Sequence, residues 1–183
     1  MSTRVRPVML AGAMIAAAFA GAARAEVVRQ WDTGFAIRHV VEAPVRADRA
    51  YAALGEVGRW WSSAHTYSGD APKALTLEMK PGGCFCEALA GGGVAHGTVV
   101  LAWPAQGMLR LDAALGPLQD QGVSGALTFT VKPKGTGASE VVLTYSVSGG
   151  PPGLAQAFAA PVDGVMGEAL SRYGRYLRTG TPD

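Results

Sequence analysis

Alternation between apolar and polar residues marks a series of short strands through the middle of the chain. The clearest runs are 127–131 and 141–147, whose period of two is typical of strands with one buried face. Clusters of glycine and proline separate the runs and predict tight turns between antiparallel neighbours. We expect six strands in series, forming an antiparallel meander, over residues 75–79, 84–89, 94–103, 108–114, 123–131 and 140–147.

Other patterns precede and follow this meander. Residues 34–42 mix alternation with β-branched side chains and predict a first strand. Two short helices are expected next, at 48–54 and, after a glycine break, around 59–61. Beyond Pro161, apolar residues recur every three or four positions as far as Leu177. This spacing predicts a long amphipathic C-terminal helix with the proline as its first residue.

The N-terminal segment has the composition of a secretory signal. Arg4 and Arg6 precede an apolar, alanine-rich run over 8–20 that contains no charged side chain. The run is too short to span a bilayer, which takes about 20 apolar residues. We expect a signal peptide over 1–25 with cleavage after Ala25, a periplasmic or secreted protein, and no membrane association of the mature chain.

Charge and composition narrow the function classes. The whole chain has 16 basic and 14 acidic side chains, and three of the basic ones lie in the predicted signal. The mature chain is therefore close to neutral, and without a basic cluster it lacks the electrostatic footprint of a nucleic-acid binder. Hydrophobic residues make up 49% of the chain, which predicts a single folded domain around a core.

The order of elements predicts an α+β fold in which one helix covers one face of a twisted sheet. This order, together with Val41–Pro44 leading into a helix, the Trp60–Trp61 pair and the Pro81–Gly83 turn, resembles the SRPBCC superfamily. That group includes START-like domains, polyketide cyclase and dehydrase-like proteins, and chaperone ATPase activators. The resemblance covers about 35–177.

The resemblance implies a helix-grip fold, a curved antiparallel sheet of roughly seven strands wrapped around the C-terminal helix. We expect a lead over 26–33, the helix-grip domain over 34–178 and a tail over 179–183. The predicted export separates the chain from the cytosolic partner that a chaperone activator needs.

The resemblance also implies a cavity between sheet and helix for a small hydrophobic molecule. We expect no cofactor, and a monomer or homodimer. The side chains expected at this cavity are aromatic, apolar or histidine: Trp60, Trp61, His65, Tyr67, Phe85, Met166, Leu170 and Tyr173.

The densest polar cluster lies in the hairpin around the Gly91–Gly93 turn. Because side chains alternate along a strand, Phe85 and Glu87 point to one face and the two cysteines to the other. One register across the turn places His96 with Glu87, and a shift by one residue places it with the cysteines. A Glu87–His96 pair in a semi-apolar cavity could act as general acid and base, as in a cyclase or dehydrase-like enzyme. The alternative is a surface ion pair of little consequence.

The state of Cys84 and Cys86 is open at this point. With His96 they could supply three ligands of a metal site, although no fourth ligand is evident. An oxidising compartment favours a disulfide, but residues two apart on a regular strand lie near the upper limit of about 6.8 Å for bridged Cα atoms. The sequence favours two partly buried free thiols, and a metal or redox module is the further alternative. Phosphate-loop, nucleophile-elbow and His-Glu-x-x-His motifs do not occur.

Overall fold

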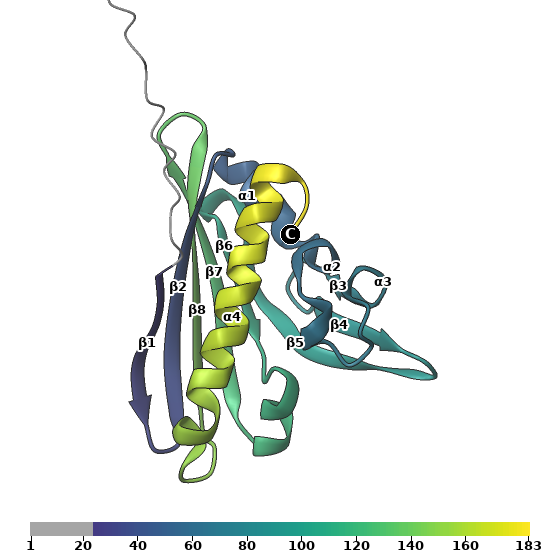
Figure 1. Cartoon of the computed structure of the whole chain (residues 1–183), viewed down its shortest axis with the longest axis vertical. Helices are drawn as coiled ribbons and strands as arrows, with labels where there is room; N and C mark the ends of the chain where they lie inside the picture. Colours follow the sequence, from purple (N-terminus) through teal and green to yellow (C-terminus); the bar gives the residue numbers. More distant parts are fainter. Residues whose placement is uncertain (1–23) are drawn as a thin grey trace, which may run out of the picture.

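The computed structural model describes residues 24–183. All but the last two residues of the predicted signal peptide lie outside the described residues. One antiparallel sheet of eight strands, in the order β1-β2-β8-β7-β6-β5-β4-β3, forms the body of the fold. Figure 1 shows helix α4 lying lengthwise against one face of this sheet. The expected α+β helix-grip architecture is confirmed.

The strands are β1 (Arg24–Trp31), β2 (Gly34–Ala43), β3 (Leu75–Leu77), β4 (Cys84–Leu89), β5 (Gly92–Trp103), β6 (Met108–Asp112), β7 (Ser124–Lys134) and β8 (Ala138–Ser148). The helices are α1 (Ala47–Leu54), α2 (Val57–Trp60), α3 (Ala71–Ala74) and α4 (Leu154–Thr179), with short 3₁₀ turns η1 (Ser63–His65), η2 (Pro104–Gln106) and η3 (Gly116–Gln121). Among residues 24–183, no helix is long and apolar enough to cross a membrane.

Strand β1 occupies the place of the expected lead and is an edge of the sheet. It pairs with β2 from Arg24↔Val40 to Trp31↔Gly34. The register of this pairing shifts between Val27 and Arg29, which interrupts the alternation of side chains along the strand. The sequence of this segment therefore lacks the period of two that marks the other strands. The sheet therefore has eight strands where the sequence predicted about seven.

The core lies between the inward face of the sheet and α4. Alternate residues of β8, Val141 to Val147, are at most 1% exposed, and so are Phe35 and Ile37 of β2. Helix α4 adds Leu170 and Tyr173 to this core. Burying each such side chain stabilises the fold by about 1.5–3 kcal/mol.

The predicted start of the terminal helix at Pro161 is wrong. Helix α4 begins at Leu154, after Gly153 in the left-handed conformation, and contains Pro161 in its interior. The N–H of Gly153 donates to Asp32 Oδ1 at 2.9 Å, which fixes the start of the helix to the β1–β2 turn. Leu154 and Ala159 are buried, so the added turns are held by packing that outweighs the poor helix propensity of proline.

A close approach at Gly125 gives a test of this sheet. A Cβ on Gly125 would lie 2.0 Å from the carbonyl oxygen of Ala113, whose N–H donates to the Gly125 oxygen at 2.8 Å. We expect Gly125→Ala to lower the free energy of unfolding by about 1–3 kcal/mol, measured by urea denaturation. Gly137→Ala is the control, because a Cβ there meets nothing within 4 Å, and its effect should stay within about 0.5 kcal/mol. Equal effects of the two substitutions would contradict this account.

Candidate functional site

A cavity of about 430 Å³ lies between the first half of α4 and the β3–β5 side of the sheet. Its size falls within the range of about 300–1,000 Å³ that is usual for small-molecule sites. Most of its walls are apolar or aromatic, and two histidines reach it. The lining residues are Trp61, Ala64, His65, Thr66, Tyr67, Leu75, Phe85, His96, Leu115, Gly116, Pro117, Leu118, Ala157, Phe158, Pro161, Val162, Val165 and Met166.

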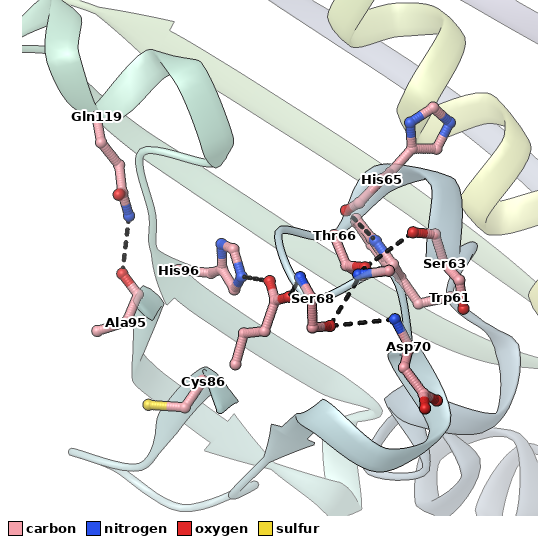
Figure 2. Close-up of polar contacts among 12 residues, drawn as sticks. Trp61, Ser63, His65, Thr66, Ser68, Asp70, Cys86, Ala95, His96 and Gln119 are labelled. Atoms are coloured by element: carbon pink, nitrogen blue, oxygen red, sulfur yellow. Dashed lines mark hydrogen bonds and ion pairs between the residues drawn. The ribbon is translucent and has the colours of Figure 1, made fainter. Parts of the chain in front are cut away.

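One wall is the loop between α2 and α3, which local hydrogen bonds hold in shape. The indole N–H of Trp61 donates to the oxygen of His65 at 3.0 Å, and the Thr66 hydroxyl donates to the oxygen of Ser63 at 2.8 Å (Figure 2). The N–H of Gly69 donates back to Thr66 Oγ1 at 3.0 Å. These bonds close a compact turn in the middle of a polar segment, so its backbone groups are satisfied beside an apolar cavity.

The structure brings Glu87 and His96 together at the cavity. Nε2 of His96 lies 2.9 Å from Oε2 of Glu87, and the two residues are 7% and 1% exposed. The backbone N–H of Ser68 donates to the other carboxylate oxygen at 2.5 Å. His96 lines the cavity, while Glu87 lies behind it. Their catalytic role stays a prediction.

A bulge in β5 places His96 on the inner face. Near the turn Glu87 pairs with Val94 and Cys86 with Ala95, but Phe85 pairs with Gly97, so His96 is the extra residue. His96 and Gly97 are consecutively buried for this reason. A Cβ on Gly97 would lie 2.7 Å from Ala113 Cβ, which explains why this bulge position is glycine.

The carboxylate of Glu87 is held in its charged form. Burial raises its pKa, but the hydrogen bonds from Ser68 and His96 together outweigh burial, and the net pKa lies below the ordinary value. A charged carboxylate only accepts hydrogen bonds, so Nε2 of His96 carries the proton between them. When the imidazole is neutral, Nδ1 is then the basic nitrogen.

A second carboxylate–histidine pair lies at the rim. Nε2 of His65 is 2.8 Å from Oε2 of Glu168 on α4, and both side chains are partly exposed. The hydrogen bond from His65 lowers the pKa of Glu168, against the opposing effect of burial. Tyr67 stacks on His96 with ring centroids 6.1 Å apart and remains 57% exposed. The rim therefore links the loop to α4 and covers one face of the imidazole.

Five of the eight expected cavity residues line it, and three do not. The lining ones are Trp61, His65, Tyr67, Phe85 and Met166. The indole of Trp60 instead donates to the oxygen of Ala53 at 3.0 Å and packs edge-on against Tyr173. Leu170 and Tyr173 lie one and two turns beyond Met166, past the end of the cavity, and are core residues.

Sequence reasoning missed two parts of the cavity wall. The first lies on α4: Ala157 and Phe158 precede the helix start that the sequence predicts at Pro161, while Pro161, Val162 and Val165 fall within the predicted helix but are not among the expected cavity residues. The second is 115–118, which Tyr145 holds by donating to Ala113 O at 2.8 Å and accepting from Leu115 N at 3.2 Å. Such a long-range tie leaves no local signal in the sequence.

The expectation of free thiols at Cys84 and Cys86 is wrong, because the two residues form a disulfide. Their Cα atoms are 5.3 Å apart, closer than a regular strand allows. The metal arrangement is not formed either, since both sulfurs are bonded to each other and His96 faces Glu87. Over 24–183 there is no group of three His, Cys, Asp or Glu side chains that could hold a metal ion.

The lowered pKa of Glu87 predicts a pH-dependent contribution to stability. A depressed folded-state pKa stabilises the fold above the unfolded pKa of about 4.5, and this is lost as pH falls through the folded value. We expect Glu87→Gln to lower the free energy of unfolding by about 1.5–3 kcal/mol near pH 7, with a smaller difference near pH 3. Urea denaturation at both pH values measures it.

The matched control is Glu78→Gln, because Glu78 is exposed and, within residues 24–183, its carboxylate forms an ion pair with Lys80 alone. Its effect should stay within about 0.5 kcal/mol at both pH values. A loss at Glu87 that is equally large at the two pH values would show that charge is not the cause.

Comparisons with known proteins give structural relatives only. No family model and no curated protein sequence matches the chain. CalU16 from Micromonospora echinospora superposes with a TM-score of 0.58 at 14% identity, over 86% of this chain and 84% of that one. A norcoclaurine synthase from Thalictrum flavum, in complex with a transition-state analogue, gives 0.52 at 16% identity, over 81% and 97%.

A third similar structure is the di-domain ARO/CYC protein BexL from the BE-7585A biosynthetic pathway. It gives a TM-score of 0.53 at 17% identity, over 76% of this chain and 45% of that one. At these identities the likeness concerns the fold. The sheet order, helix α4 against one face of the sheet and these neighbours together show that the described chain has the helix-grip fold that its order of elements led us to expect.

Proposed function

We propose that this protein binds a small hydrophobic molecule in the cavity under α4. The observation that carries the proposal is the cavity itself, about 430 Å³ with mostly apolar walls. Leaving such a surface to water is unfavourable, and an apolar molecule of matching size removes it from water at about 25 cal/mol per Å². The structural similarity to a synthase and to an ARO/CYC protein supports a role for the cavity in holding an organic molecule.

The walls favour a flat, unsaturated molecule. Trp61 and Phe85 meet edge to face at 5.7 Å, and Phe85 contacts His96 at 5.2 Å between ring centroids. Aromatic faces and edges arranged in this way suit another ring better than a branched aliphatic chain. Polar contact is confined to the histidines and the Thr66–Tyr67 segment of the loop.

Export is part of the proposal. The basic start, the short apolar run and the small residues before Glu26 support a cleaved signal peptide. The Cys84–Cys86 disulfide supports an oxidising compartment, since cytosolic reductants keep most thiols reduced. Cleavage after Ala25 would leave most of β1 on the sheet.

Native mass spectrometry of the protein recovered from the periplasm tests binding and export together. We expect a chain that starts at Glu26 and carries a noncovalent organic mass that is lost on denaturation. A chain starting at Met1 in that fraction would contradict cleavage after Ala25, and absence of the protein from the periplasmic fraction would contradict export. The same spectrum reports whether the protein is a monomer or a homodimer, which stays a prediction.

Binding has its own control variants. Val165→Trp fills the cavity from α4, whereas Ala160→Trp places the same side chain on an exposed, non-lining position of that helix. We expect the first to weaken binding of the apolar dye Nile red at least tenfold, about 1.4 kcal/mol, and the second to leave it unchanged. Equal affinities of the two variants would place the dye site elsewhere.

Acid–base catalysis on the bound molecule is a second candidate function, and a specific observation favours it. A carrier needs only apolar walls, but this cavity holds an imidazole backed by a buried, charged carboxylate. Glu87 orients the ring through its bond to Nε2, while Nδ1 can take a proton from a bound substrate and return it elsewhere. The reaction class is proton transfer next to a carbonyl, as cyclisation or dehydration requires.

Solvent deuterium exchange of 2-tetralone, a small bicyclic ketone, tests this activity. We expect the protein to accelerate loss of its α-protons in D₂O, followed by NMR, and His96→Phe to reduce the acceleration about 100-fold or more. His65→Phe is the comparison, because His65 also lines the cavity but pairs with Glu168 at the rim. Unchanged exchange in His96→Phe would eliminate His96 as the base.

A further inference from the structure

The Cys84–Cys86 disulfide flanks the one residue of β4 that faces the β5 bulge. Phe85 lies between the two cysteines and pairs with Gly97, beyond the extra residue His96. The disulfide and the bulge therefore lie opposite one another on paired strands. Glu87 follows Cys86 directly, and His96 is the extra residue of the bulge. Both members of the Glu87–His96 pair therefore lie next to the disulfide or in the bulge.

The sulfurs and the acid–base pair occupy opposite faces of the sheet. Cys86 pairs with Ala95 and Thr76, both exposed, and Cys84 pairs with the exposed Thr98. Paired residues in an antiparallel sheet point to the same side. The disulfide is thus on the outer face, partly exposed and within reach of a reductant, and Figure 2 shows the Cys86 sulfur turned away from Ser68.

The cross-link shortens β4 at this point. The Cα atoms of Cys84 and Cys86 are 5.3 Å apart, whereas residues two apart on a regular strand are separated by about 6.4–6.8 Å. A contracted β4 opposite an expanded β5 is the mismatch of length that a bulge requires. On the β6 side, Gly97 lies so close to Ala113 that a Cβ on Gly97 would clash with it. This close approach holds the bulge in its place.

We propose that the Cys84–Cys86 disulfide is a positioning device for the Glu87–His96 pair, and that a dithiol reductant loosens this pair by opening it. A thiolate of the reductant attacks one sulfur and the S–S bond breaks, forming a mixed disulfide. The second thiol of the reductant then displaces the protein sulfur. Two electrons and two protons end on Cys84 and Cys86, and the reductant becomes a disulfide.

The consequence for the cavity follows from the contacts. Released from the cross-link, β4 can extend by more than 1 Å at Phe85, against a β5 whose bulge is fixed. The side chains that move are Phe85, which contacts the His96 ring, and Glu87, whose bond to His96 is 2.9 Å long. This inference deepens the second candidate function and rests on it for its biological meaning.

The test observes the pair directly and needs no substrate. In protein labelled with ¹⁵N-histidine, the Nε2 proton of His96, identified by its loss in His96→Phe, should exchange slowly with water because it is buried and bonded to Glu87. We expect reduction by dithiothreitol, and the Cys84→Ser/Cys86→Ser variant, to speed this exchange at least tenfold. The variant should not respond to the reductant.

An internal reference separates positioning from general destabilisation. The backbone amides of β8, away from the hairpin, should exchange at unchanged rates. Equal exchange of His96 in oxidised, reduced and serine forms would overturn the proposal, and so would a rise that β8 shares. If the serine variant fails to fold, the reduced native chain carries the test. If the oxidised protein does not accelerate ketone exchange but reduction still speeds the exchange of the His96 proton, the proposed catalysis is contradicted and this inference stands.

Discussion

The buried carboxylate of Glu87 is the constraint on which the site depends. An isolated charge taken out of water costs several kcal/mol, so a residue that is 1% exposed must be surrounded by donors. The donors come from two directions, Ser68 from the loop and His96 from β5. The loop and the two strands of the β4–β5 hairpin are thereby joined at one point, and the loop cannot move away without leaving one oxygen of the buried carboxylate without its donor.

The opposite wall of the cavity, formed by the first half of α4, has weaker hydrogen bonding within the helix. Pro161 lacks the N–H that would bond to the oxygen of Ala157, and Gly164 follows it within one turn of α4. This part of the helix is held to the sheet by packing and by His39, fully buried, whose Nε2 lies 2.9 Å from Oδ1 of Asp163. A firmly bonded wall that contains the Glu87–His96 pair therefore faces a helical wall with weaker internal bonding. Entry of a molecule into the cavity would require less disruption on the α4 side.

Periodicity was sufficient to predict the fold but not the register. The series of strands, including the bounds of β4, could be predicted because alternation and glycine-rich turns are visible in short stretches of sequence. The pairing of His96 with Glu87 depended on a bulge whose only local trace is Gly97, and the need for glycine there arises from Ala113 on another strand. The sequence leaves the disulfide as an alternative to free thiols, because a regular strand holds residues two apart near the upper limit for bridged Cα atoms, and the shortening of β4 to 5.3 Å between these Cα atoms cannot be seen in the sequence.

The location of the departures from regular structure is itself informative. Register shifts also occur between β1 and β2 and between β5 and β6, but among residues 24–183 the β4–β5 hairpin alone combines a shift with a buried charge and a disulfide between near neighbours. Local rules are broken where something other than stability is being selected, and the cost is met by the regular core elsewhere. An apolar carrier would gain nothing from a charge beneath its binding surface. The concentration of these features beneath one imidazole is therefore an argument for chemistry at the cavity, and not only for storage within it.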